Sequence, residues 1–167
     1  MKKMKFETAL IHAGQEADIQ TGSVNVPIYQ TSTYKQDAIG KNRGWEYSRT
    51  GNPTRKALED CIAALEGARH GLAFASGLAA ETAVLGIMKK GDHVVAGDDL
   101  YGGTYRLFEE VFRKWGLEVS YADSKDPASF KKALRLNTRL IWAETPTNPL
   151  LSITDISALV EIAKKAK

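Results

Sequence analysis

The chain has 167 residues, of which 43% are hydrophobic and 26% are charged, a composition typical of globular proteins and not of disordered ones. Its net charge of +3 comes from 23 basic and 20 acidic residues spread along the sequence, too diffuse a distribution for a nucleic-acid-binding surface. No apolar run approaches the roughly 18–20 residues that cross a bilayer, and the single cysteine cannot form a disulfide within the chain.

Residues 1–45 show little hydrophobic periodicity and carry scattered turn-forming glycines and a proline. This predicts an extended N-terminal arm with at most one short helix, packed on another element or on a neighbouring subunit. The first residues, MKKMKFETALIHAG, are basic but lack the apolar core of a secretory signal, which favours a cytoplasmic location.

Residues 46–167 have the pattern of an α/β domain, and its first helix is predicted at 53–66. Asn52 can cap this helix, Pro53 suits the first helical position, and Gly67 is a typical stop signal. Apolar residues recur between these signals at helical spacing, with Cys61 among them, so the cysteine is predicted to belong to the core.

The rest of the chain alternates between short apolar runs typical of buried strands and amphipathic runs typical of helices. Strands are predicted at 70–76, 92–98, 117–123 and 139–144, and helices at 77–91, at 105–115, from 126 and from 155. This alternation predicts a mostly parallel sheet with helices on both faces. No strand follows the last helix, so we expect the chain to be the N-terminal part of a longer protein.

In an open parallel sheet, ligands bind beyond the carboxyl ends of the strands. The loop ASGLAA places Ser76 and Gly77 between a predicted strand and a helix. Free N–H groups and the helix dipole could bind a phosphate there, or the serine could simply cap the helix. Neither a P-loop nor a G-x-G-x-x-G sequence is present, which disfavours a nucleotide-binding domain.

Two further loops carry residues suited to ligand contact. In GDDLYGGTYR, Tyr101 stands beside two glycines, where its ring could stack on a ligand or transfer a proton, or could lie in an ordinary turn. Arg106 follows and could bind a carboxylate or cover the surface. In ETPTNP, two prolines fix the chain around Asn148, whose amide could donate to a ligand oxygen or serve the turn, and Glu144 could be a supporting acceptor.

The stretch YSRTGNPTR, residues 47–55, places several anion-binding groups directly before the first predicted helix. In their order and separations, YSRTGNPTR, SGLAA, DDLYGGTYR and ETPTNPLL resemble the N-terminal part of the cystathionine gamma-synthase and gamma-lyase family. These are fold-type-I enzymes that depend on pyridoxal 5'-phosphate (PLP). The resemblance extends over essentially the whole chain.

The resemblance implies how the cofactor phosphate is bound. Tyr47 and Arg49 are expected to reach into the active site of a neighbouring subunit and bind the phosphate there. The backbone of Gly77 and Leu78, with Ser76 beside it, is expected to bind the same phosphate from within the subunit. Dimers that share active sites in this way are expected to form a homotetramer.

The resemblance also assigns the remaining site residues. Tyr101 is expected to stack on the pyridine ring and is the candidate catalytic proton carrier, and Asn148 to contact the phenolic oxygen side of the ring. Arg49, Tyr101 and Arg106 are the candidate substrate-binding residues. The three histidines are scattered without metal-ligand spacing, so no metal site is predicted.

The implied activity is gamma-elimination or gamma-replacement on cystathionine or a related homoserine or homocysteine derivative, in the transsulfuration chemistry of sulfur amino acids. An O-acylhomoserine sulfhydrylase remains an alternative. A methionine gamma-lyase is less favoured, because Gly103 stands where those enzymes characteristically have a cysteine. The family's Schiff-base lysine is missing from these 167 residues, so this chain alone is expected to be inactive. A non-catalytic oligomerisation or binding module is the alternative of a different class.

Overall fold

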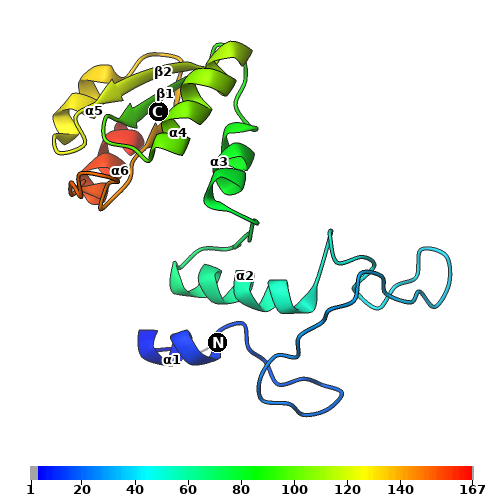
Figure 1. Cartoon of the computed structure of the whole chain (residues 1–167). Coiled ribbons are helices and arrows are strands. Elements are labelled where there is room, and N and C mark those ends of the chain that lie inside the picture. Colours follow the sequence, from blue (N-terminus) through cyan, green and yellow to red (C-terminus); the bar gives the residue numbers. More distant parts are fainter. Residues whose placement is uncertain (1–3, 167) are drawn as a thin grey trace. The chain divides into compact units, whose positions relative to one another are not determined.

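The computed structural model describes residues 4–166, and the chain divides into two compact units, one up to Ala73 and one from Phe74. The first unit contains two helices, α1 (Phe6–His12) and α2 (Pro53–Leu65), which pack on each other (Figure 1). The backbone between them is irregular. Residues 4–45 therefore have the irregular course and the single short helix that the sequence predicts.

The start of α2 follows from its sequence signals. Asn52 is the N-cap, and its side-chain oxygen accepts the N–H groups of Thr54 at 2.9 Å and Arg55 at 3.4 Å. Pro53 occupies the first turn, where no N–H is needed. Gly67, with φ of 62°, follows the end of the helix in the left-handed region. The predicted helix at 53–66 is confirmed to within one residue.

The second unit is built on a three-stranded parallel sheet of order β2-β1-β3. The strands are β1 (His93–Gly97), β2 (Glu118–Ala122) and β3 (Thr138–Trp142). All five residues of β1 are buried, because a central parallel strand is covered on both faces; apart from His93, they are apolar or glycine without alternation.

One helix precedes the first strand, and the others connect the strands or follow the last one. They are α3 (Gly77–Leu85), α4 (Gly102–Arg106), which continues as a π-helical turn (Leu107–Phe112) and a 3-10 turn (Arg113–Trp115), α5 (Pro127–Ala133) and α6 (Ile156–Lys165). Asp126 and Asp155 cap α5 and α6 by accepting a backbone N–H, each at 2.9 Å.

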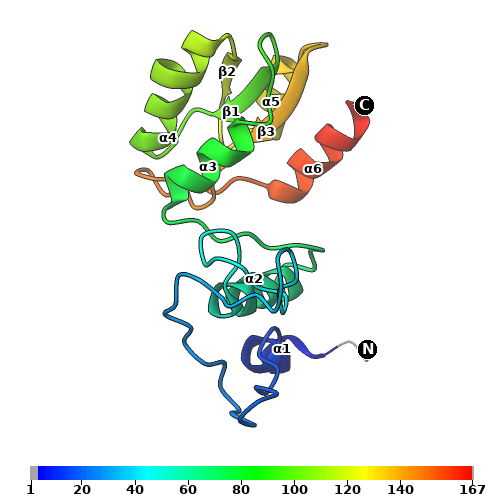
Figure 2. The same cartoon turned by 90° about the vertical axis from the view of Figure 1, so that its right-hand side faces the viewer.

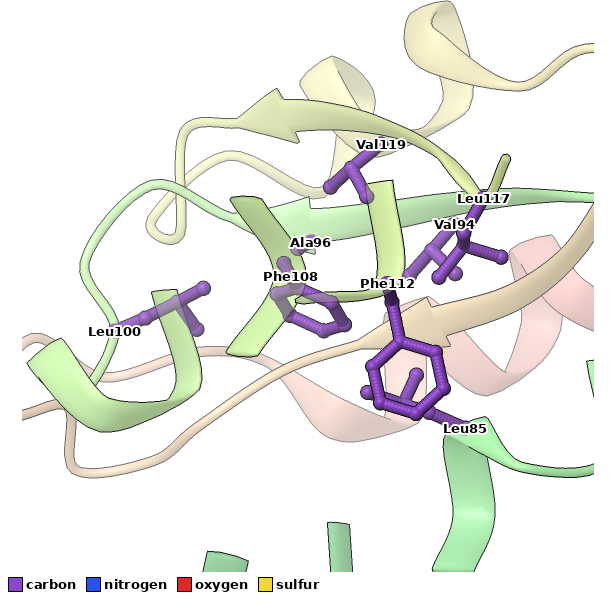
Figure 3. Packing of buried hydrophobic residues seen from close by; sticks show 8 residues of the cluster. All are labelled: Leu85, Val94, Ala96, Leu100, Phe108, Phe112, Leu117 and Val119. Atoms are coloured by element: carbon purple, nitrogen blue, oxygen red, sulfur yellow. The ribbon is translucent and has the colours of Figure 1, made fainter. Parts of the chain in front are cut away.

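Each face of the sheet has its own apolar cluster. On one face, Val94 and Ala96 of β1 pack with Phe108 and Phe112 of the long helix that α4 begins (Figure 3). On the other face, Val95 packs with residues of α5 and α6, among them Phe130 and Leu159. Figure 2 shows α4 and α6 on opposite sides of the sheet. The prediction of a parallel α/β sheet with helices on both faces is confirmed.

The predicted strand at 70–76 is wrong. No strand in residues 4–166 pairs with this segment, whose first half lies along α2 instead. The N–H of Ala73 donates to the carboxylate of Glu59 at 3.0 Å, and a Cβ on Gly71 would lie 2.3 Å from the carbonyl oxygen of Glu59. Leu72 is 77% exposed, so the apolar pattern that suggested a buried strand is not buried within the described chain.

Two predicted helix boundaries also differ from the structure. The helix predicted at 77–91 ends at Leu85, and Gly91 lies beyond it in a turn where its N–H donates to the carbonyl of Gly116 at 2.8 Å. The helix predicted from residue 105 begins at Gly102, because two glycines do not prevent a first helical turn.

Within residues 4–166, no helix is long and apolar enough to cross a membrane.

Candidate functional site

The loops that follow β1 and β2 are joined by hydrogen bonds at the carboxyl edge of the sheet. The carboxylate of Asp98, directly after β1, accepts both the N–H and the hydroxyl of Ser124, each at 3.0 Å. The N–H of Asp99 donates to the same hydroxyl at 3.4 Å. These bonds fix the start of the loop that leads to Tyr101.

A second link joins the loop after β1 to the loop after β3. The hydroxyl of Thr147 donates to the carboxylate of Asp99, and both residues are buried. The hydroxyl of Thr147 also accepts the N–H of Ser152 at 2.7 Å, which closes the turn that contains Asn148. A buried polar group without a hydrogen bond is destabilising. The bond between Thr147 and Asp99 avoids this cost for both side chains and holds the two loops together.

Glu144 also links the loop after β1 to the loop after β3. Its carboxylate accepts the N–H of Tyr101 at 3.0 Å, and its carbonyl oxygen accepts the hydroxyl of Thr154 at 3.0 Å. Glu144 is thus an acceptor, as the sequence suggests, while its role as a support in a ligand site stays a prediction.

The ring of Tyr101 lies against Gly103. A Cβ on Gly103 would be 2.4 Å from Cε1 of Tyr101, 3.0 Å from its Cδ1 and 3.1 Å from Cδ1 of Leu78. The absence of a side chain at Gly103 therefore leaves the space that the tyrosine ring fills. Tyr101 is 46% exposed, so part of the residue is available to a ligand.

The start of α3 lies in the same unit. Ser76 is the N-cap, and its hydroxyl accepts the N–H of Ala79 at 3.2 Å, so the capping role weighed in the sequence is confirmed. Within residues 4–166, no acceptor is bonded to the N–H groups of Gly77 and Leu78. A Cβ on Gly77 would meet no atom within 4 Å, which leaves open space beside these two donors.

Two polar side chains of the predicted site are exposed. In the described part of the chain, neither the amide of Asn148 nor the guanidinium of Arg106 has a hydrogen-bonded or ionic partner. One guanidinium nitrogen of Arg106 lies 3.4 Å from the position of a Cβ on Gly102. Both side chains are therefore available to an anionic or carbonyl-bearing ligand.

Tyr47 and Arg49 belong to the first unit, where they lie together. The guanidinium carbon of Arg49 is 4.7 Å from the centroid of the Tyr47 ring, a cation–π arrangement. The backbone of Tyr47 pairs with that of Thr33 in an isolated antiparallel bridge. The two side chains are exposed and present a hydroxyl and a cation side by side.

Sequence reasoning missed the role of Arg55 in this loop. Its guanidinium donates to the carbonyl oxygens of Ser48 at 3.0 Å and Thr50 at 3.1 Å, and it pairs with Glu59 at 3.4 Å. Arg55 thus holds the backbone on both sides of Arg49. A positive charge one helical turn ahead of a glutamate was the only local signal for it.

His93 forms a separate polar network at the amino ends of the strands. Its ring nitrogens lie 2.7 Å from the hydroxyl of Thr138 and 3.0 Å from that of Ser120. Burial, and then the nearby Arg135, lower the pKa of His93. Within residues 4–166, no three His, Cys, Asp or Glu side chains are grouped as metal ligands.

A family described as Cys/Met metabolism PLP-dependent enzymes has a sequence model that matches residues 7–167. The chain belongs to this family. The resemblance seen in the sequence motifs is therefore confirmed.

Curated members of this PLP-dependent family match nearly the whole chain. A probable cystathionine gamma-synthase of Herpetosiphon aurantiacus is 55% identical over 96% of the chain and 50% of its own length. A cystathionine gamma-lyase of Bacillus subtilis is 52% identical over 98% of the chain and 43% of its own length. A cystathionine beta-lyase of Coxiella burnetii is 49% identical, with the same two coverages. The chain thus spans half or less of the length of these relatives.

The fold agrees with that of a solved PLP-dependent relative. The crystal structure of metB from Corynebacterium glutamicum superposes with a TM-score of 0.91 at 50% identity, over 97% of this chain and 43% of that one. At this identity and similarity, the described chain has the fold of the corresponding part of that structure.

Proposed function

We propose that the full-length protein is a PLP-dependent enzyme that acts on cystathionine or a related sulfur amino acid by gamma-elimination or gamma-replacement. The observation that carries the proposal is the position of the Tyr101 ring. Its partly exposed ring lies on Gly103 beside Leu78, at the carboxyl edge of a parallel sheet where ligands bind in such folds.

The residues of the second unit fit the cofactor chemically. The free N–H groups of Gly77 and Leu78, at the positive end of α3, suit the phosphate, while Ser76 holds the helix start. Tyr101 offers a flat ring for stacking, and Asn148, whose amide has no partner within residues 4–166, offers a donor to an oxygen on the cofactor ring.

The residues of the first unit complete the phosphate site in the proposal. Arg49 supplies a charge and a bidentate fork, and Tyr47 supplies a neutral hydroxyl beside it. We place them in the active site of a neighbouring subunit, within dimers that assemble into a homotetramer. Exposed apolar side chains in the first unit support an interface there, among them Phe6 at 60% and Ile11 at 65% exposure.

PLP, when bound, supplies an electron sink for carbanion chemistry on amino acids. Tyr101 is the proposed catalytic residue, whose hydroxyl would hold or move a proton at the substrate. Arg106, which has no ionic partner in the described chain, and Arg49 are proposed to bind the carboxylate of the substrate.

We prefer chemistry at the gamma carbon because two relatives with 55% and 52% identity are named for it, against 49% for a beta-lyase. Gly103 bears instead on the choice among enzymes that act at the gamma carbon. A cysteine there would meet the ring of Tyr101, which disfavours a methionine gamma-lyase with the present position of that ring.

The test is product analysis with the full-length protein, PLP and cystathionine. Cleavage on the gamma side with water yields cysteine, 2-oxobutyrate and ammonia, whereas cleavage on the beta side yields homocysteine, pyruvate and ammonia. A second reaction with an acylated homoserine and cysteine tests for the synthase. Pyruvate as the only oxo acid would contradict gamma chemistry, and no product in either reaction would contradict the proposal as a whole.

A further inference from the structure

The carboxylate of Glu144 is bonded to backbone, not to a cation. In the described part of the chain it takes part in no ion pair, and its bond is the one it accepts from the N–H of Tyr101 at 3.0 Å. Hydrogen bonds to an ionised acceptor are stronger than neutral ones. A negative charge is therefore directed at a single main-chain N–H.

Glu144 is itself held firmly. It lies two residues after the end of β3, and its carbonyl oxygen accepts the hydroxyl of Thr154 at 3.0 Å. The neighbouring link from Thr147 to Asp99 joins the same pair of loops. The acceptor for Tyr101 is thus fixed relative to the sheet.

The carbonyl oxygen of Tyr101 accepts the N–H of Tyr105 at 3.1 Å, and in the described residues its own N–H has no acceptor other than Glu144. Tyr101 is the N-cap of α4, no side chain caps that helix, and its φ and ψ of −51° and 131° mark the point where the loop turns into the helix. Its ring rests on Gly103 and beside Leu78. Because the ring is attached to this one backbone position, a movement there moves the ring across Gly103.

We propose that Glu144 is a positioning residue for Tyr101. Its carboxylate fixes the N–H of Tyr101 and so keeps the ring packed against Gly103. This inference rests on the proposed function for its consequence at the cofactor, but the bond itself is testable without any cofactor.

The first experiment measures hydrogen exchange of the peptide containing Tyr101 in the cofactor-free, full-length protein. Glu144→Ala removes the acceptor, Glu144→Gln keeps an oxygen acceptor, and Glu110→Ala makes the same change at an exposed glutamate of the same unit. We expect exchange of the Tyr101 amide to accelerate about 10-fold to 100-fold in Glu144→Ala and less than about 3-fold in the other two variants. Exchange at the wild-type rate in Glu144→Ala overturns the proposal.

The second experiment asks whether Glu144 acts through Tyr101. The dissociation constant of PLP and the visible circular dichroism of the bound cofactor are measured for Glu144→Ala, Tyr101→Ala and the double variant. We expect Glu144→Ala to raise the dissociation constant about 5-fold to 30-fold alone and less than about 3-fold when Tyr101 is already alanine. Equal factors in both backgrounds contradict a role through Tyr101.

The two experiments separate the two hypotheses. A full-length protein that binds no PLP refutes the proposed function, while the exchange rates still decide whether Glu144 holds Tyr101. If Glu144→Ala does not fold, Glu144→Gln is compared with Thr154→Val, which frees the carbonyl of Glu144. We then expect faster Tyr101 exchange in Thr154→Val alone, and equal exchange in both variants overturns the proposal.

Discussion

Two adjacent glycines begin α4, and the structure gives them different tolerance for a methyl group. A Cβ on Gly103 would lie 2.4 Å from Cε1 of Tyr101, closer than real Cβ contacts allow, whereas a Cβ on Gly102 would meet only a guanidinium nitrogen of Arg106 at 3.4 Å. Neither glycine has a positive φ, so alanine strains the backbone at neither position. Comparing alanine at the two positions therefore tests whether the Tyr101 ring packs against Gly103 as the structure shows.

The expected magnitudes follow from these distances. Alanine in place of glycine stabilises by about 0.4–1 kcal/mol when its backbone fits, because the unfolded chain has less entropy to lose. Gly102→Ala should show this gain. The free energy of unfolding of Gly103→Ala should be about 1–3 kcal/mol lower than that of Gly102→Ala, because the added methyl group either overpacks against Tyr101 or displaces its ring.

The assay is urea unfolding of the cofactor-free, full-length protein at one fixed protein concentration, with PLP affinity measured in parallel. We expect Gly103→Ala to be less stable than Gly102→Ala by about 1–3 kcal/mol and to bind PLP more weakly. In a Tyr101→Ala background, the stability difference should shrink to less than about 1 kcal/mol, because the obstructing ring is gone. Equal stability and equal PLP affinity of the two single variants would refute the claim that the Tyr101 ring requires a glycine at position 103.

The remaining predictions concern the first unit and the buried histidine. Arg49→Ala should weaken PLP binding by about 1.5–3 kcal/mol, measured by equilibrium dialysis, and unchanged affinity would exclude Arg49 from the site. Mixing inactive Arg49→Ala and Tyr101→Ala enzymes should restore roughly a quarter of wild-type activity if the first unit acts in a neighbouring subunit; no recovery after confirmed subunit exchange would contradict sharing. The lowered pKa of His93 favours its neutral form when folded, so its stabilisation is complete above about pH 6.5 and is lost as the pH falls through the folded-state pKa. Urea unfolding between pH 7.5 and 5.5 should therefore show a steeper loss in the wild type than in His93→Gln, and parallel curves would disprove this contribution.

The sequence predicted best those features that depend on neighbouring residues. Asn52 with Pro53, Asp126 with Pro127, and Asp155 mark helix starts that the structure confirms, because a cap bonds N–H groups only two or three residues away. The three observed strands were predictable for a related reason. Each is a short apolar run between turn signals, and two of them flank a central strand that is buried on both faces.

Features that depend on distant residues could not be predicted in this way. The segment 70–76 has the composition of a buried strand, but a strand also needs a partner, and in the described chain its first half contacts Glu59 instead. The link from Thr147 to Asp99 joins residues 48 positions apart, and neither residue has a local signal for it. Only Glu144 was predicted as a support, because it stands at a strand end beside a rigid turn.

The site residues fall into two physical classes, which should respond differently to mutation. Asp99 and Thr147 are buried and bonded to each other, so removing either partner leaves an unsatisfied buried group and should reduce stability together with function. Asn148 and Arg106 are exposed and have no partner within residues 4–166, so their removal should leave the fold unchanged. The sequence motif brings members of both classes together in one turn, since Thr147 directly precedes Asn148. The buried neighbour holds the backbone of the turn, while the exposed amide of Asn148 has no bonded partner within residues 4–166 and is the group proposed to contact a ligand.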